Sequence, residues 1–207
     1  TDISFCGSID DISKTENLQP IMIAFQLAVL KLIRAHKPEL LKGLKSTCGL
    51  SLGEYSALAL SEIIDEDDAL RLVAIRGALM GKASENRSSK MLAILKMTED
   101  EVREVLQSHP EFEGKVYIAN INSSRQIIVS GEGSAIDELK DFLKSNKKLA
   151  KPLSVSGAFH TPFMESARSP FIETLEETSF SSPKISYYPN VTGEKYDGTP
   201  MVHVLSE

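Results

Sequence analysis

The chain has 207 residues, 42% of them hydrophobic and 25% charged, which is the composition of an ordinary soluble globular protein. Its formal net charge of −6 argues against nucleic acid as the main partner, because phosphate binding needs a basic face. Two cysteines, Cys6 and Cys48, are too few for a disulfide framework and favour a reducing compartment. No apolar run approaches the roughly 18 residues of a membrane span, so no membrane partner is expected.

The first third of the chain predicts a helix, a strand and a second helix. Residues 1–19 are polar and are expected to form a short helix or loop leading into Pro20, which suits a first helical turn. From Ile21 to His36 apolar residues recur at helical spacing, which predicts an amphipathic helix. Residues 44–50 predict a buried strand that contains Cys48, and residues 52–61 predict the helix after it.

Between that strand and that helix lies Gly49-Leu50-Ser51-Leu52-Gly53, a Gly-x-Ser-x-Gly element. At a sharp strand-to-helix turn, glycines on both sides of the serine let the backbone pass a strained corner, so that the hydroxyl projects as a nucleophile. The N–H of Leu52 then points from a helix N-terminus into the same space, where it can stabilise an oxyanion. The structural alternative is a Gly-Ser turn that caps a helix.

The next predicted helix, residues 67–83, carries an arginine among apolar residues. Arg76 shares the core face with Ala69, Leu72, Val73, Leu79, Met80 and Ala83. A buried guanidinium is costly unless an anion meets it. Arg76 therefore either extends outward to a surface carboxylate or forms a fork for a ligand carboxylate.

Residues 89–153 predict an inserted subdomain with the order β-α-β-β-α-β, the ferredoxin-like arrangement. The expected elements are a strand at 91–96, a helix from 98 to about 108, a hairpin of 116–122 and 126–131, a helix at 134–145 and a strand at about 150–156. Residues 1–88 and 154–207 then form the larger α/β body with a parallel sheet. Asn120 and Asn122 are expected on one side of their strand, bonded locally at the hairpin end or lining a cleft.

The chain returns to the larger body through Gly157-Ala158-Phe159-His160. Thr161 is the expected N-cap and Pro162 the first residue of the following helix, which Pro170 should kink or split. A lone histidine is usually structural, but a strand end is where α/β proteins carry functional groups. Ile185–Tyr188 predicts a last strand.

Taken together, these stretches resemble the malonyl-CoA:acyl carrier protein transacylases of type II fatty acid synthesis. The motifs are Gly49 to Tyr55, Ile75-Arg76-Gly77, Asn120 to Ser123, and Gly157 to His160. Their order and intervals agree with the family's, and the match covers almost the whole chain. The resemblance implies an α/β-hydrolase-like core with an inserted ferredoxin-like subdomain.

The resemblance also implies a ping-pong transfer of malonyl from malonyl-CoA to the phosphopantetheine thiol of acyl carrier protein. Ser51 would be the nucleophile, His160 the general base, and Arg76 the ligand of the malonyl carboxylate. Phe159 resembles the malonyl-selective form of its motif, and Asn122 is a further candidate for substrate binding. No metal site and no bound cofactor are expected, and the partners implied are acyl carrier protein and malonyl-CoA, with the enzyme a monomer.

Two features differ from the family pattern. The chain starts after the expected Gly-Gln-Gly-Ser-Gln stretch and stops before the segment whose carbonyl orients the histidine, so it is interpreted as part of a longer enzyme. Leu50 stands where many bacterial members have His, and Leu occurs in plastid-type and some bacterial members. An intracellular, reducing location is expected, either a plastid-type organelle or the bacterial cytoplasm.

Two other functions stay open at this point. A serine hydrolase or esterase of α/β type would share the Ser51 turn and the histidine, but it needs an acid between them and has no use for Arg76. A non-catalytic module that binds carrier protein is the second alternative. Adduct formation on Ser51 separates the transferase from that module.

Overall fold

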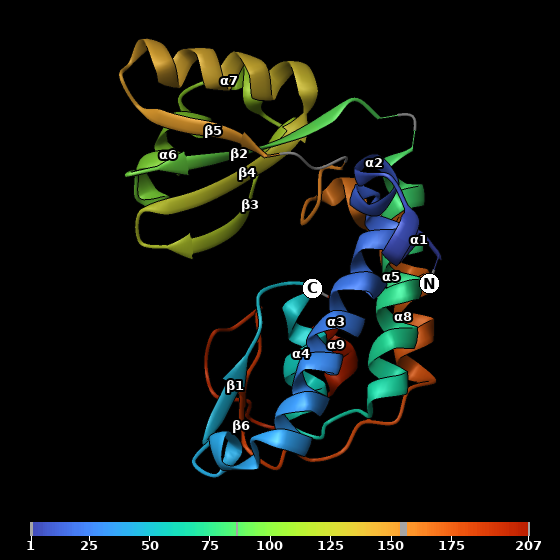
Figure 1. Ribbon diagram of the computed structural model, residues 1–207. Coiled ribbons are helices and arrows are strands. Elements are labelled where there is room, and N and C mark those ends of the chain that lie inside the picture. The colour runs from blue at the N-terminus through green and yellow to red at the C-terminus, as the bar shows by residue number, and fades with distance from the viewer. Residues whose placement is uncertain (1, 86, 154–156, 207) are drawn as a thin grey trace. The chain divides into compact units, whose positions relative to one another are not determined.

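The computed structural model describes residues 2–85, 87–153 and 157–206. It divides into two compact units (Figure 1). Thr1–Leu79 with Arg168–Glu207 forms one, called the serine unit below, and Met80–Ala167 forms the other, called the histidine unit. The subdomain expected at 89–153 lies within the histidine unit, and its exact boundaries stay a prediction.

The serine unit is mainly helical, with one small sheet. Its helices are α1 (Asp2–Cys6), α2 (Ile9–Ser13), α3 (Thr15–His36), the 3-10 turn η1 (Pro38–Leu41), α4 (Gly53–Leu60), α5 (Glu66–Ser84), α8 (Glu165–Glu176) and α9 (Met201–Leu205). Helices α5 and α8 both extend into the histidine unit. The core is built mainly from apolar residues of α3, α4 and α5, with Phe171 and Leu175 of α8 and Tyr187 of β6.

The sheet of the serine unit consists of β1 (Ser46–Cys48) and β6 (Ser186–Tyr188), which pair in parallel. Ser46 pairs with Ser186 and Cys48 with Tyr188, so the carboxyl ends of both strands lie at the same edge. Cys48 is exposed, and the expectation that it is buried is wrong. Residues at alternate positions of a strand share a face, and the Ser46 and Cys48 face of β1 is the uncovered one.

Helix α3 is longer than its sequence pattern predicts. It begins at Thr15, so Pro20 lies inside the helix instead of in its first turn. The polar side chains of Thr15 and Gln19 are buried, which explains why an apolar periodicity alone misses this turn.

Among the helices that the structure describes, α3 is long and apolar enough to cross a membrane, with 22 residues and a mean hydropathy of 1.4. This is weak evidence, because core helices of soluble proteins pass the same test. Its exposed apolar residues are Met22, Phe25, Val29 and Leu32. The expectation that the chain has no membrane partner therefore remains a prediction.

Helix α8 runs through Pro170 without ending there, so the expected split is wrong. The missing N–H removes one intrahelical bond, while Phe171 and Leu175 on the same helix bury their side chains in the core of the serine unit. Tertiary packing thus keeps the helix continuous.

The histidine unit is a four-stranded antiparallel sheet with helices on one face. Its elements are β2 (Ser89–Leu95), α6 (Glu99–Gln107), the 3-10 turn η2 (Pro110–Phe112), β3 (Val116–Ser123), β4 (Gln126–Glu132), α7 (Gly133–Ser145), β5 (Leu149–Leu153) and the 3-10 turn η3 (Pro162–Met164). The strand order is β3-β4-β2-β5, and every pairing is antiparallel. The succession of strands and helices is the one the sequence predicts; residues 154–156 of the expected last strand lie outside the described residues.

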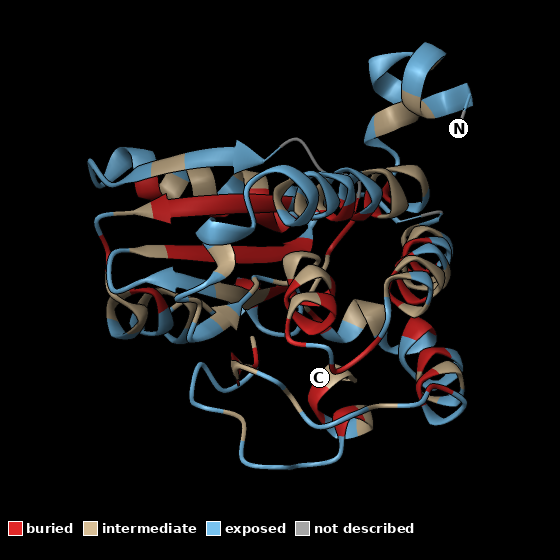
Figure 2. Ribbon diagram, turned by 60° about the horizontal axis from the view of Figure 1, so that its bottom comes forward, coloured by how far each residue is buried: buried red, intermediate tan, exposed pale blue. Residues whose placement is uncertain are grey.

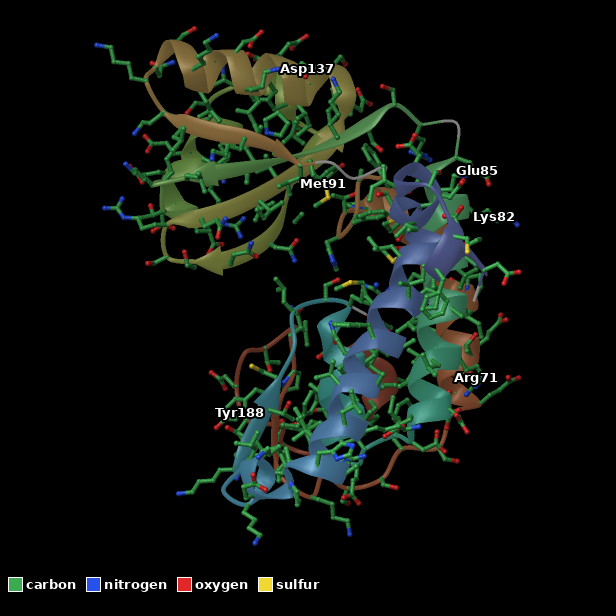
Figure 3. The ribbon with its side chains drawn as sticks, in the orientation of Figure 1. Arg71, Lys82, Glu85, Met91, Asp137 and Tyr188 are labelled. Carbon is green, nitrogen blue, oxygen red and sulfur yellow. The ribbon has the colours of Figure 1, made fainter. Side chains whose placement is uncertain are left out.

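Alternation along β2 divides the core of this unit between the two faces of the sheet. The two central strands, β2 and β4, are largely buried (Figure 2). Leu92 and Ile94 pack with α6 and α7, whereas Ala93 and Met91, which is labelled in Figure 3, belong to the cluster on the other face. The opposite face is covered by Phe159, which precedes the candidate histidine. The sheet therefore positions the segment that contains His160.

Candidate active site

Ser51 lies at a strained corner between β1 and α4. Its φ is 48°, in the left-handed region that residues other than glycine adopt at a cost of about 1–3 kcal/mol. Gly49 makes the corner possible, because a Cβ there would overlap the backbone of Gly53 and Glu54. A Cβ at Gly53 would meet nothing within 4 Å, so only the first glycine of the motif is sterically required.

The backbone of this corner is held from the end of the neighbouring strand. The Ser51 N–H donates to Oδ1 of Asn190, which follows β6 by two residues. The N–H groups of Gly53 and Glu54 donate to the carbonyls of Leu50 and Ser51. Leu52 is the N-cap residue of α4, so its N–H belongs to the first turn, where donors lack intrahelical partners.

Glu54 is a buried carboxylate one turn beyond Ser51. Its Oε1 accepts from the Tyr187 hydroxyl at 2.5 Å and from the Asn190 N–H at 2.7 Å. Burial raises the pKa of Glu54, and these two hydrogen bonds together with the charge of Arg76 oppose that rise. Burial also raises the pKa of Tyr55, the next residue of α4.

Arg76 extends from α5 to the serine. Its Nη2 donates to Ser51 Oγ at 3.1 Å and its Nη1 to Gln19 Oε1 at 2.8 Å, while the guanidinium lies 5.8 Å from the centre of the Tyr55 ring. None of the ion pairs among the described residues involves Arg76. The surface-carboxylate alternative is thus wrong for this structure: the guanidinium is half-buried and bonded to neutral oxygens beside the serine.

Two residues that touch this site were not singled out from the sequence. Gln19 is buried on α3 and joins Arg76 to Thr15, whose Oγ1 accepts from Gln19 Nε2 at 2.9 Å. The close approach of α3 and α5 depends on Gly77, where a Cβ would lie 2.8 Å from the Thr15 carbonyl oxygen. The sequence could have pointed to Asn190, because polar residues just past the carboxyl end of a parallel strand often belong to functional sites. Nothing in the sequence distinguishes Gln19 in this way.

His160 belongs to a short loop that packs on the sheet of the histidine unit. Phe159 contacts the face formed by Met91, Ala93 and Ile128. His160 itself has φ 57°, a left-handed conformation like that of Ser51. Thr161 is the N-cap of η3 as predicted: its hydroxyl donates to the Ala158 carbonyl at 2.6 Å and accepts from the Phe163 N–H at 3.2 Å.

Further contacts fix both ends of this loop. Gly157 allows a close approach, because a Cβ there would overlap the Phe159 ring and the Ser84 hydroxyl. At the other end, Phe163 contacts Tyr117 edge to face and lies under the Arg87 guanidinium at 5.2 Å. A hollow of about 390 Å³ near this end is lined by Arg87, Ser88, Ser89, Glu132, Ser134 and Phe163, none of which is a predicted site residue.

Asn122 is exposed near the end of β3, where the register shifts between Ile121 and Ser123. Because simple alternation is interrupted at such a shift, the expectation that Asn120 and Asn122 share one side stays a prediction. Among the described residues, no group of three or more His, Cys, Asp or Glu side chains is placed to bind a metal ion.

Ser51 and Arg76 are therefore brought together within the serine unit, while Phe159 and His160 are held in the histidine unit. A serine in a left-handed strand-to-helix turn, at the carboxyl edge of parallel strands, has the backbone geometry of the elbow found in one class of α/β proteins.

The comparisons with known proteins identify the family within that class. Residues 7–205 match the acyl transferase domain, and the chain belongs to this family. It is 33% identical over 184 residues to a malonyl CoA-acyl carrier protein transacylase of Staphylococcus aureus. The aligned residues cover 88% of this chain and 58% of that protein. The chain thus spans little more than half the length of this relative.

Solved structures agree with the fold. A malonyl CoA-acyl carrier protein transacylase from Clostridium perfringens superposes with a TM-score of 0.86 at 33% identity, covering 99% of this chain and 64% of that one. A malonyl-transacylase solved in complex with a type II polyketide synthase acyl-carrier protein gives a TM-score of 0.87 at 27% identity, covering 99% of this chain and 66% of that one. The predicted α/β fold, with a parallel and an antiparallel sheet, is confirmed.

Proposed function

We propose that this chain is the acyl-transferring part of a malonyl-CoA:acyl carrier protein transacylase. The observation that carries the proposal is the Arg76 guanidinium, which donates to two neutral oxygens, Ser51 Oγ and Gln19 Oε1. A guanidinium binds a carboxylate in a bidentate manner, so this position suits an acyl group that ends in a free carboxylate. Malonyl is such a group, and it is the one that the names of these relatives give.

The reaction proceeds in two half-reactions. Ser51 Oγ attacks the thioester carbonyl of malonyl-CoA, His160 takes the hydroxyl proton, and the CoA thiolate leaves with that proton. The phosphopantetheine thiol of acyl carrier protein then gives its proton to His160 and attacks the malonyl-serine ester. Ser51 leaves as the alcohol and the carrier holds the malonyl thioester. No bound cofactor takes part, and malonyl-CoA enters as substrate.

The other roles follow from position and chemistry. The Leu52 N–H stabilises the oxyanion at the start of α4, where the positive end of the helix dipole adds to the effect. Phe159 limits the space beside the acyl group and so favours malonyl over branched groups, and Asn122 is a further candidate for substrate binding. The monomeric state and the intracellular, reducing location stay predictions; both cysteines are free thiols.

Intact-protein mass spectrometry after brief mixing with malonyl-CoA tests the proposal. The protein should gain one malonyl group, and Ser51→Ala should abolish the gain. The acceptor half-reaction is then followed by loss of the adduct when phosphopantetheinylated carrier protein is added. Loss of the adduct to water at the same rate without carrier would favour a hydrolase.

A further inference from the structure

Ser51 is held from its backbone side by a residue outside the Gly-x-Ser-x-Gly element. Its N–H donates to the Asn190 side-chain oxygen. Ser51 stands just beyond β1 and Asn190 just beyond β6, and these strands are parallel neighbours. The two residues therefore meet because the carboxyl ends of both strands lie at one edge.

Asn190 is held in turn by the helix that leaves the serine. Glu54 on α4 accepts the Asn190 N–H and the Tyr187 hydroxyl on the same oxygen, Oε1. Glu54 and Tyr187 are buried. These contacts form a closed circuit: the chain joins Ser51 to Glu54 on α4, the Glu54 side chain accepts from the Asn190 N–H, and the Asn190 side chain accepts from the Ser51 N–H.

This circuit meets a physical need of the corner. A left-handed conformation at a residue with a Cβ persists only where surrounding contacts hold it. The Asn190 amide supplies a neutral acceptor, so it fixes the Ser51 backbone without placing a negative charge where an oxyanion would form. The Glu54 carboxyl group is linked to the Ser51 N–H through Asn190, which it holds by the Asn190 N–H.

We propose that Asn190 and Glu54 are positioning residues for the serine: Asn190 holds Ser51 in its left-handed conformation, and Glu54 holds Asn190. The reaction that they serve rests on the proposed function, whereas the hold on the backbone does not. One consequence is that the Ser51 N–H is committed to Asn190, which leaves the Leu52 N–H as the elbow's donor to an oxyanion.

Amide hydrogen exchange at Ser51, followed by NMR, tests the hold directly. In Asn190→Ala the Ser51 amide should exchange at least about tenfold faster than in the unmodified chain, as expected for the loss of one hydrogen bond. The matched control is Asn146→Ala, which removes an asparagine that bonds the Phe142 carbonyl at the end of α7 and should leave Ser51 unchanged. An unchanged Ser51 exchange rate in Asn190→Ala would overturn the proposal.

A second variant keeps the test decisive if Asn190→Ala does not fold. Asn190→Asp retains an acceptor oxygen, so the Ser51 amide should stay protected while its proton chemical shift follows the titration of the introduced carboxyl group. A Ser51 amide shift that does not change with pH in this variant would show that the side chain at 190 does not bind it.

The reaction supplies an independent measurement. Asn190→Ala and Glu54→Ala should lower the rate constant of Ser51 acylation about 10- to 100-fold, with the KM for malonyl-CoA within about threefold, because positioning acts on the nucleophile. Glu54→Gln, which keeps an oxygen acceptor, should restore most of the rate. A rise in KM at an unchanged rate constant would contradict positioning. If the unmodified chain forms no adduct, the proposed function fails while the exchange experiment still decides the hold on Ser51.

Discussion

At the scale of residues, the two glycines on either side of Ser51 differ in the space around them. Gly49 packs against the backbone of Gly53 and Glu54, whereas Gly53 faces open space. A sequence motif gives both glycines equal weight, but the structure makes only the first one indispensable for the fold.

This asymmetry predicts opposite effects of one substitution at two positions. Gly49→Ala should lower the free energy of unfolding by about 1–3 kcal/mol, because its Cβ overlaps backbone that cannot rotate away. Gly53→Ala should leave stability unchanged or raise it by up to about 1 kcal/mol, since alanine favours helix. Urea unfolding of the pair checks this, and equal destabilisation by both would count against the geometry of the elbow.

The buried Glu54 carboxyl predicts a dependence of stability on pH. Burial raises its pKa above the ordinary 4.5, so the folded state holds the proton more tightly than the unfolded state does. The stability from Glu54 is therefore fully present below pH 4.5 and is lost as pH rises through the raised pKa. Burial raises the pKa of Tyr187, which donates to Glu54, so this hydroxyl stays protonated in this range.

Glu54→Gln removes this titration and keeps an acceptor for Asn190. The free energy of unfolding of the unmodified chain, relative to that of Glu54→Gln, should fall as pH rises from about 4.5 toward neutrality. Denaturant unfolding at a series of pH values measures the difference. A difference that increases with pH would mean that Glu54 is stabilised as a carboxylate.

At the scale of elements, local signals in the sequence predict most of the secondary structure. The capping box at Thr98 and Glu101, the hairpin around 123–125 and the helix that carries Arg76 all appear where expected, because each depends on neighbours in sequence. The expected place of Pro20 in a first turn and the expected split at Pro170 were wrong, because tertiary packing of α3 and α8 outweighs the local cost of proline.

The candidate site was predictable only in part for the same reason. Ser51 and Arg76 stand out because one lies in a motif and the other breaks an apolar stripe. Asn190, just beyond β6, bonds Ser51 although the two are 139 positions apart in sequence, and Gln19 on α3 bonds Arg76 on α5. Such contacts depend on how strands and helices pack, which no local pattern records.

The capping box of α6 is a local device whose contribution can be measured. The Thr98 hydroxyl accepts from the Glu101 N–H, and Glu101 accepts from the Thr98 N–H at 2.7 Å. Thr98→Ala should cost about 1 kcal/mol of stability in denaturant unfolding. Ser8→Ala removes a similar cap from α2, which has no buried residues, and should cost less than about 0.5 kcal/mol. Equal costs would show that the box contributes no more than an exposed cap.

At the scale of the molecule, the two units have separate cores. Leu72 is fully buried in the core of the serine unit and Leu139 in that of the histidine unit, and the two clusters share no residue. Leu72→Ala and Leu139→Ala should each cost about 2–5 kcal/mol. Hydrogen exchange should show the loss of protection mainly in the unit that carries the substitution. A loss spread equally over both units would mean that they unfold as one.

The proposed catalysis draws on residues of both units. The serine unit supplies Ser51 with Arg76, and the histidine unit supplies His160 on a loop fixed by Phe159 and Thr161. The chain spans 58% of the length of its Staphylococcus relative.

The most direct test of the account is the ratio of malonyl to acetyl adduct on Ser51, measured by intact-protein mass spectrometry in the unmodified chain and in Arg76→Ala. A hydrogen bond to a charged group contributes about 1.5–3 kcal/mol, so the substitution should lower the malonyl rate about 10- to 100-fold relative to the acetyl rate. An unchanged ratio, with adducts still formed on Ser51, would contradict the central claim that Arg76 binds the free carboxylate of the acyl group.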